Sequence, residues 1–319
     1  MTTPLTESIA AALARRDELS RQLLVEGTDA YRIFHGVAEG RPGLTVDRYG
    51  DHALVQTSRE PLTEAELAAL GDQLRWPLVW RHRGPRPLGA REPLAPSPFS
   101  ELGVSYSAPL VHRGQDPWLF LDFRAGRRWI QAHAAGKRVL NLFSYTGASG
   151  LVAATAGATE VLNVDHGGWP LKAAQDLALL NGVTVETLRS DHFLAVRQLA
   201  GLKIRGRAVR KGFERIEQRR FDLVVLDPPT FTKGPFGAVD IVRDYAGLLK
   251  PALLCLARDG VCLATNHSAK VELEEWTDQL ERCASKAGRP LTGLEILSPE
   301  ADFPSTDGKP PLKIAVLRV

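Results

Sequence analysis

The sequence predicts an α/β protein in which a small α+β domain precedes a doubly wound parallel sheet. From residue 137 onward, apolar runs of strand length alternate with segments of helical length, as in parallel β-α-β units. Before residue 115, glycines and prolines separate short apolar runs, which is a β-rich pattern with tight turns. Since 319 residues suffice for two domains, we expect the α+β domain over residues 1–115 and the larger domain over residues 116–319.

The elements of the first domain follow from residue spacing. Leucines and an isoleucine recur at helical spacing over residues 5–24, with charged residues between them. Glycines punctuate the β-rich segment 32–56, and a helix over residues 62–74 and a strand near residues 78–80 come next. Five prolines between residues 84 and 98 predict an extended surface connector.

The second domain is expected to alternate strands and helices. The strands cover residues 138–142, 160–164, 184–188, 221–226, 261–265, 291–297 and 313–319. One helix is expected directly after Thr146, and further helices are expected over residues 168–181, 192–200, 239–257 and 272–287. In such a sheet the ligand lies at the carboxyl ends of the strands, so the residues directly after each strand are the candidates for a site.

Composition excludes several classes of protein. Apolar residues make up 44% of the chain and charged residues 24%, as in soluble globular proteins. No stretch approaches 18 uncharged apolar residues, and the N-terminal segment lacks the basic and apolar regions of a secretory signal. We therefore expect no membrane association and a cytoplasmic location. The three cysteines form no Cys-x-x-Cys pair, so no metal site is expected.

Positive charge is concentrated in two segments. Residues 75–91 hold five arginines and no acid, and residues 200–220 hold eight lysines and arginines against two glutamates. Either segment alone is more simply explained as a solvated face, but two beside a nucleotide-binding type of fold indicate a polyanion such as RNA. The candidate RNA contacts are Arg205, Arg207, Arg210 and Lys211.

Acidic and small residues follow the expected strands. Small residues up to Gly150 let a helix N-terminus approach a ligand closely, although a helix packed on a sheet needs them as well. Asp165 follows the second strand, where an acid can accept hydrogen bonds from both ribose hydroxyls. Asp191 follows the third strand and can bind an adenine amino group, with Phe193 covering the ring, or can cap the next helix.

The most specific motif, Asp227-Pro228-Pro229-Thr230-Phe231, follows the fourth strand. Two prolines stiffen a turn and leave its carbonyl groups pointing outward, where a planar amine or base can bind.

Together these motifs resemble class I S-adenosylmethionine-dependent methyltransferases. The resemblance rests on Asn-x-Phe-x-Tyr-Thr-Gly at 141–147, the strand-end Asp165, Asp-x-Phe at 191–193 and Asp-Pro-Pro-x-Phe at 227–231. The chain is similar, more narrowly, to the bacterial 23S rRNA large-subunit methyltransferases, of which one branch makes 5-methylcytosine and another 7-methylguanine. Two further segments, 40–50 and 118–128, match the same family, so that the resemblance covers roughly residues 30–270.

The resemblance implies a Rossmann-like class I methyltransferase domain that uses S-adenosyl-L-methionine and acts on RNA. The implied cofactor residues are Phe143, Tyr145, Gly147, Asp165, Asp191, Phe193, Arg124 and Arg127. The two arginines contact the methionine carboxylate or a phosphate, or else form a salt bridge to the sheet. The residues implied to face the target base and carry catalysis are Asp227, Pro228, Pro229 and Phe231.

The chain departs from the 5-methylcytosine branch after the fifth strand. That branch carries Ser-Cys-Ser there, and its thiolate attacks the base, whereas this chain has Asn266-His267-Ser268. Cys262 lies inside the expected strand and is interpreted as a buried apolar filler. Because a base nitrogen needs only alignment with the methyl group, we expect a nitrogen target, with Asn266 and His267 beside the substrate. His267 orients the base or accepts a proton, or is only a strand-end histidine.

Three alternatives stay open at this point. A 5-methylcytosine enzyme with a displaced cysteine would still belong to the same family. A non-catalytic RNA or nucleotide-binding protein would keep the pocket but not the chemistry. A nicotinamide-dependent oxidoreductase would share the fold and the acid at Asp165, but it predicts Gly-x-Gly-x-x-Gly where Phe143, Ser144 and Tyr145 precede Gly147.

Overall fold

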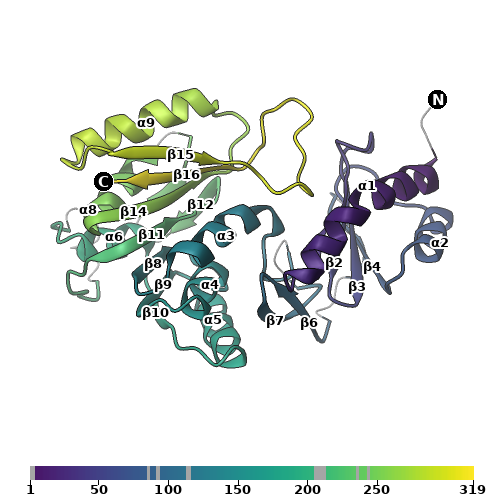
Figure 1. The fold of residues 1–319 in the computed structure, drawn as a ribbon, viewed down its shortest axis with the longest axis horizontal. Coiled ribbons are helices and arrows are strands. Elements are labelled where there is room, and N and C mark those ends of the chain that lie inside the picture. Colours follow the sequence, from purple (N-terminus) through teal and green to yellow (C-terminus); the bar gives the residue numbers. More distant parts are fainter. Residues whose placement is uncertain are drawn as a thin grey trace. The chain divides into compact units, whose positions relative to one another are not determined.

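The computed structural model describes residues 4–84, 87–90, 94–112, 116–204, 213–234, 237–242 and 245–319. The chain divides into two compact units, which are described separately (Figure 1). Unit 1 comprises residues 1–124 and 299–308, and unit 2 comprises residues 125–298 and 309–319. Within the described ranges, no helix is long and apolar enough to cross a membrane.

Unit 1 is built on a five-stranded sheet of order β1-β2-β3-β4-β5. Its strands are β1 (Ala30–His35), β2 (Leu44–Tyr49), β3 (His52–Thr57), β4 (Leu78–His82) and β5 (Leu88–Gly89). Helices α1 (Leu5–Val25) and α2 (Glu64–Gln73) contribute apolar side chains to a common core with this sheet. Thr63 and Glu66 cap α2 reciprocally, which explains why the second predicted helix begins there.

A separate antiparallel hairpin in unit 1 joins β6 (Pro96–Glu101) to β7 (Val104–Pro109). The extended connector predicted over residues 84–98 is therefore wrong at two places, since Leu88–Gly89 pair with β4 and Pro96 begins β6. Prolines are tolerated in this hairpin because a two-stranded sheet consists of edge strands, where a missing N–H costs little.

Unit 2 is a doubly wound α/β unit on a seven-stranded sheet of order β10-β9-β8-β11-β14-β16-β15. The strands are β8 (Arg138–Leu142), β9 (Glu160–Asp165), β10 (Glu186–Arg189), β11 (Phe221–Leu226), β14 (Leu256–Asn266), β15 (Gly293–Leu297) and β16 (Lys313–Arg318). The pairs from β10 to β14 are parallel, and β16 runs antiparallel to both of its neighbours. The parallel doubly wound sheet is confirmed, with an antiparallel strand near one edge.

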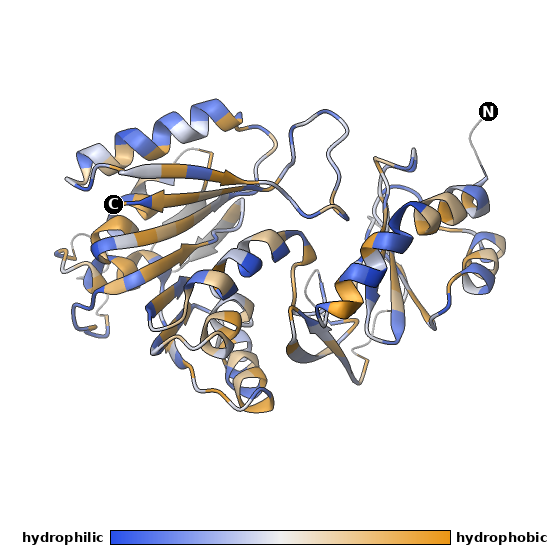
Figure 2. Ribbon diagram, in the orientation of Figure 1, coloured by the Kyte–Doolittle hydropathy of each residue, from blue (hydrophilic) through white to orange (hydrophobic). Residues whose placement is uncertain are grey.

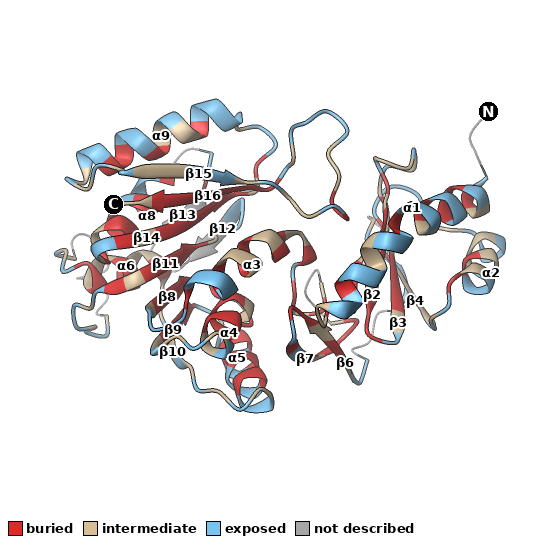
Figure 3. Cartoon of the chain, viewed as in Figure 1, coloured by how far each residue is buried: buried red, intermediate tan, exposed pale blue. Residues whose placement is uncertain are grey.

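Helices cover both faces of this sheet. α4 (Ala148–Thr155) and α5 (Gly168–Leu180) pack on one face, and α6 (His192–Leu199), α8 (Tyr245–Leu254) and α9 (Leu273–Lys286) pack together on the other. α3 (Arg124–His133), which follows the short helix η1 (Leu121–Phe123), precedes the first strand of the sheet. The central strands are apolar in Figure 2 and buried in Figure 3, as the continuous apolar runs predicted.

One prediction for unit 2 is wrong in detail. The helix expected over residues 239–257 covers only Tyr245–Leu254, and a hairpin of β12 (Phe231–Gly234) and β13 (Gly237–Asp240) precedes it. The first residues of that expectation have no helical periodicity of their own, and the last ones pair with β11, where Leu256 lies opposite Phe221.

Candidate functional site

The turn after β8 has an unusual backbone. Phe143, Tyr145 and Gly147 have positive φ angles of 58°, 49° and 76°. Such angles are uncommon for aromatic residues and concentrate at ligand sites, where the surrounding structure holds the strain. Here the Ser144 N–H donates to the Val164 carbonyl (3.0 Å), and the Gly147 N–H donates to the Ser144 carbonyl (2.8 Å). The turn thus leads directly into the N-terminus of α4.

The small residues of this turn also have a packing role. A Cβ atom at Gly150 would lie 2.3 Å from Oδ1 of Asn163, and one at Gly147 would lie 2.7 Å from the Cβ of Ala174. Asn163 in turn accepts a buried hydrogen bond from Asn141 (2.8 Å). Close packing on the sheet therefore explains Gly150, whereas the positive φ at Gly147 belongs to the turn itself.

Asp165 ties together the loops that follow three adjacent strands. Its carboxylate accepts hydrogen bonds from the backbone N–H of Tyr145 (3.0 Å) and of Gly167 (2.8 Å), and its carbonyl accepts from the Ser190 N–H (3.0 Å). The residue is 7% exposed. Each carboxylate oxygen can accept a second hydrogen bond, so Asp165 can hold this edge of the sheet and still bind two hydroxyls.

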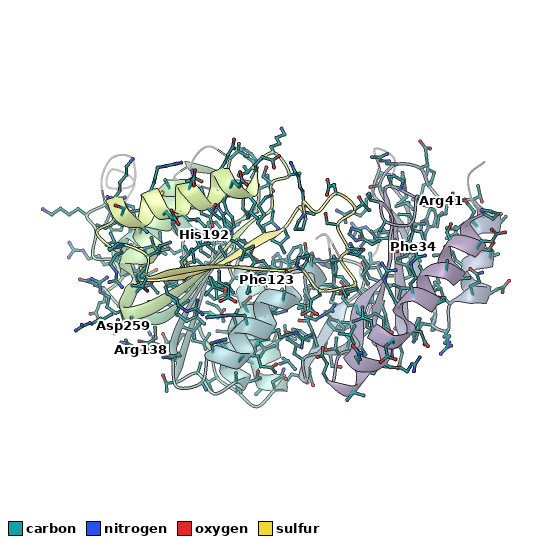
Figure 4. The ribbon with its side chains drawn as sticks, turned by 45° about the horizontal axis from the view of Figure 1, so that its top comes forward. Phe34, Arg41, Phe123, Arg138, His192 and Asp259 are labelled. Carbon is teal, nitrogen blue, oxygen red and sulfur yellow. The ribbon has the colours of Figure 1, made fainter. Side chains whose placement is uncertain are left out.

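The segment after β10 places a histidine against the turn. The His192 ring stacks on Phe143 with centroids 3.7 Å apart, while Phe193 packs against the hydrophobic core (His192 is labelled in Figure 4). Burial, with a smaller contribution from His166, lowers the pKa of His192 to about 3, so this ring is neutral. Asp191 accepts hydrogen bonds from the N–H groups of Phe193 (3.0 Å) and Leu194 (3.2 Å) and caps α6, the second of the two roles foreseen for it.

One cluster in this region has ligands suited to a metal ion. Asp165, His166 and His192 each offer a ligand atom, and these atoms lie within 4.8 Å of one another. Sequence spacing alone did not reveal the cluster because two of its members follow β9 and the third follows β10.

A second polar group lies at the ends of β11 and β14. Oδ1 of Asp227 accepts hydrogen bonds from Nε2 of His267 (2.7 Å) and from the hydroxyl of Thr265. Burial opposes ionisation of this carboxyl group, but His267, Thr265 and Arg127 outweigh it and lower the pKa of Asp227. The carbonyl groups of Pro228 and Pro229 accept no hydrogen bond from the part of the chain that the structure describes. The turn thus presents a carboxylate and two carbonyl acceptors.

The cysteines lie away from this polar group. Cys255, Cys262 and Cys283 are 0%, 0% and 8% exposed. Burial raises the pKa of all three thiols, that of Cys255 to about 12. Cys262 lies within β14 and packs in the core, which confirms its interpretation as an apolar filler.

Comparison with known proteins decides the class of this site. Residues 51–318 match the family model described as S-adenosylmethionine-dependent methyltransferase. The chain belongs to this family. The methyltransferase is therefore an enzyme that uses S-adenosylmethionine, and the predictions of fold, enzyme class and cofactor are confirmed. The oxidoreductase alternative is excluded by the same match.

Among curated proteins, the methyltransferase is similar to "Ribosomal RNA large subunit methyltransferase I" of Aeromonas salmonicida, at 29% identity over 91% of this chain and 73% of the relative. A "Ribosomal RNA large subunit methyltransferase" of Deinococcus radiodurans is 30% identical over 88% of this chain and 70% of the relative. A methyltransferase "K/L" of Marinobacter nauticus is 37% identical, over 50% of this chain and 21% of the relative.

Solved structures support the fold. A methyltransferase crystallised with SAH superposes with a TM-score of 0.81 at 22% identity, covering 98% of this chain and 80% of the other. An S-adenosylmethionine-dependent methyltransferase of Agrobacterium tumefaciens gives a TM-score of 0.65 at 21% identity, covering 92% and 90% of the two chains.

The turn after β8 fits S-adenosylmethionine. Buried polar atoms without a protein partner are expected where a polar ligand binds. Two such atoms in the described residues are Oγ of Ser144, which lies in this turn, and Nδ1 of His192, whose ring stacks on Phe143. Asp165 adds acceptor capacity beside them.

Arg124 and Arg127, which the sequence analysis assigned to one role, have different surroundings in the structure. The fully buried Arg124 donates to Glu101 (3.2 Å), to Asp302 (2.9 and 3.1 Å) and to the Ala30 carbonyl (3.3 Å), all within unit 1. This is the salt-bridge alternative, although the partners lie in unit 1 rather than in the sheet. Arg127 is buried in unit 2 and acts electrostatically on Asp227.

The remaining candidates lie in different settings. Asn266 is fully buried at the end of β14, where its Oδ1 accepts a hydrogen bond from the Ser268 N–H (2.9 Å) and its Nδ2 has no hydrogen-bond partner among the described residues. Phe231 begins β12 and is 56% exposed. Arg205, Arg207, Arg210 and Lys211 lie outside the described residues. Thr265 was missed because a strand threonine carries no signal in sequence; only the pairing of β11 with β14 places it beside Asp227.

Proposed function

We propose that this methyltransferase modifies large-subunit ribosomal RNA at a nitrogen atom of a base. The observation that carries the nitrogen assignment is the Asp227-Pro228-Pro229 turn, where a carboxylate and carbonyl acceptors stand at the carboxyl edge of the sheet without a thiol. The RNA assignment rests on relatives that are named for ribosomal RNA and that match most of this chain.

The target atom follows from what the site offers. Methylation at cytosine C5 needs a thiolate that attacks the ring, because this carbon is a poor nucleophile. The three cysteines are buried and their thiols are held in the neutral form. A base nitrogen carries its own lone pair and needs only alignment with the methyl donor, which hydrogen-bond acceptors in a rigid turn provide.

The two groups of residues at the edge of the sheet have different proposed roles, one in binding the cofactor and the other in orienting the base. The turn at Phe143–Gly147 and Asp165 would hold S-adenosylmethionine, whose sulfonium supplies an electrophilic methyl group. Asp191 stays a proposed adenine contact through the carboxylate oxygen that does not cap α6. Asp227 and the proline carbonyls would orient the base, with Phe231 as an exposed aromatic surface for it.

RNA capture is assigned to the basic segments. We propose residues 1–115 as an RNA-binding domain that precedes the catalytic domain 116–319 in the sequence, with Arg205, Arg207, Arg210 and Lys211 as further phosphate contacts. A cytoplasmic location is the natural setting for an enzyme with this substrate.

The decisive experiment incubates the purified enzyme and S-adenosylmethionine with protein-free 23S rRNA and identifies methylated nucleosides by mass spectrometry. A base methylated at nitrogen supports the proposal. A 5-methylcytosine product, or a covalent complex trapped with 5-fluorocytosine RNA, contradicts the nitrogen assignment, and RNA left unmethylated contradicts the substrate.

A Cys262→Ala variant tests the absence of thiol chemistry independently. We expect turnover to be retained, with a stability loss of about 1–2 kcal/mol from the small cavity. Loss of turnover in a folded variant would restore the 5-methylcytosine alternative with a displaced nucleophile.

A further inference from the structure

The Asp227–His267 pair is positioned by two neighbouring strands. β11 and β14 are parallel, with Leu226 opposite Ala264, so the next residues, Asp227 and Thr265, lie side by side. Thr265 donates its hydroxyl proton to Oδ1 of Asp227, and His267 approaches the same oxygen through Nε2 at 2.7 Å. The carboxylate is therefore tied to the neighbouring strand through Thr265 and binds the imidazole through the same oxygen.

This contact defines the state of the imidazole. An ionised carboxylate only accepts hydrogen bonds, so the ring nitrogen that faces it, Nε2, must carry a proton. In a neutral imidazole the lone pair then belongs to Nδ1. The depressed pKa of Asp227 keeps the carboxylate ionised and so maintains this tautomer.

The exposure of His267 and its carboxylate partner suit a residue that exchanges a proton with a substrate. Arg127 acts electrostatically on Asp227, and Nζ of Lys313 donates to the carbonyl of Ser268, the residue after His267 (2.8 Å). Asp227, whose carboxylate binds Nε2, stabilises the imidazolium that forms when the ring takes up a proton. The His267 side chain is 27% exposed, while Thr265 is fully buried, so the histidine is the member of the group that lies nearest the solvent.

We propose that His267 is a general base. The group that is methylated is then the exocyclic amino group of a nucleobase, such as adenine, guanine or cytosine. This inference rests on the proposed function and sharpens it. Among nitrogen targets, an exocyclic amine must lose a proton when it is methylated, whereas guanine N7 has no N–H to lose. A histidine poised to accept a proton is needed only in the first case.

The proposed step balances as follows. The amine lone pair forms the new N–C bond to the methyl carbon while the C–S bond breaks. The electron pair of the C–S bond stays on the sulfur, which becomes a neutral thioether. The nitrogen, now cationic, gives one N–H proton to Nδ1 of His267. Asp227 stabilises the resulting imidazolium through Nε2 and acts as a positioning residue, as does Thr265 through Asp227. The proton then passes to water.

The test combines product identity with two matched histidine variants. His267→Gln removes the base at similar size, with His267→Asn as a second variant if the first folds poorly. His133→Gln is the control, because His133 is an exposed residue of α3 whose ring stacks on Trp129. Single-turnover methylation of 23S rRNA is followed between about pH 6 and pH 9, and S-adenosylmethionine affinity is measured by calorimetry.

We expect the product to be an N-methylated exocyclic amine. His267→Gln should lower the rate about 10²–10⁴-fold, with unchanged S-adenosylmethionine affinity. It should also abolish the loss of rate that the wild type shows on acidification, when a base becomes protonated. His133→Gln should match the wild type. A merely structural His267 would lower stability but leave the pH profile in place, and that result would overturn the assignment.

The outcomes separate this inference from the function on which it rests. A 7-methylguanine product would overturn the amine assignment and leave nitrogen methylation of rRNA intact. A 5-methylcytosine product would overturn both the amine and the nitrogen assignments. RNA that stays unmethylated would overturn the proposed function itself.

Discussion

Two clusters in this protein pair an aspartate with a nitrogen-containing side chain, one in a buried environment and one in a partly exposed environment. In unit 1, Arg124 lies between Glu101 and Asp302, and all three side chains are fully buried. In unit 2, Asp227 binds His267, and these side chains remain 24% and 27% exposed. The first cluster joins residues far apart in the sequence, since Asp302 is 178 positions beyond Arg124. The second joins the ends of two adjacent strands.

The difference teaches which cluster can take part in chemistry. Burial opposes the charge on Arg124, but Asp302 and Glu101 outweigh it and raise the pKa of Arg124, so the guanidinium never releases a proton. With no exposed atom, that cluster can only hold unit 1 together. His267, by contrast, is partly exposed and can pass a proton between a substrate and solvent, and its carboxylate partner fixes its tautomer. Four aspartate variants test this comparison.

The largest effect is expected at Asp227. Asp227→Asn removes the charge that orients and stabilises His267, so we expect turnover to fall about 10²–10⁴-fold. The fold should persist, since the side chain is partly exposed and asparagine can keep the hydrogen bond from Thr265. Single-turnover kinetics measure the loss of turnover, and a thermal melt of the same sample shows whether the fold persists. A variant that melts early and loses activity in proportion would place Asp227 with the structural cluster.

The next effect is expected at Asp302, on stability instead of chemistry. Asp302→Asn leaves the buried Arg124 without one of its two carboxylates and weakens the acceptor of the Arg32 N–H (2.9 Å). Breaking a buried ion pair typically costs about 3–5 kcal/mol. Urea unfolding should show this loss, and the exposed Asp51→Asn in the same unit should stay within about 0.5 kcal/mol of the wild type. If the two variants lowered the free energy of unfolding equally, the buried cluster would contribute no more to stability than an exposed aspartate does.

Much of unit 2 could be predicted from sequence, for a physical reason. Its central strands are buried on both faces, so they appear as continuous apolar runs, and Arg138–Leu142 and Phe221–Leu226 were placed with the bounds that the structure has. Strand ends then point to site residues, because every parallel strand delivers its next residue to the same edge. Asp165 and Asp227 were proposed as site residues in this way.

The parts that sequence did not predict depend on contacts between distant residues. Nothing local links Arg124 to Asp302, and both sit in segments that resemble ordinary loop or helix starts. The β12–β13 hairpin was missed because the sequences of its two short strands contain no apolar run. At residues 191–193 the sequence does not show which ring meets Phe143, because this depends on how α6 begins, and the helix directs His192 there.

A third, intermediate effect is expected at Asp165. Asp165→Asn keeps the size of the side chain but removes the charge that would accept hydroxyl hydrogen bonds, worth about 1.5–3 kcal/mol. We expect S-adenosylmethionine affinity to fall about 10–150-fold by calorimetry. Asp176→Asn, on the exposed face of α5, is the control. Unchanged affinity at Asp165 would limit it to holding the Tyr145 and Gly167 backbone.

The smallest effect is expected at Asp222, on the same strand as Asp227 but at its amino end. Asp222 pairs with Arg138 (3.0 Å; Arg138 is labelled in Figure 4), and the Arg138 hydrogen bond lowers the pKa of Asp222. The Arg138 side chain is 42% exposed, so solvent screening limits the pair to about 0.5–1 kcal/mol. A depressed pKa stabilises the fold above the unfolded value near 4, and the benefit is lost as the pH falls through the folded value. Asp222→Asn should therefore be slightly less stable than the wild type at pH 7, equally stable near pH 2, and unchanged in turnover. Lost turnover would mean that the two ends of β11 are not divided between stability and chemistry.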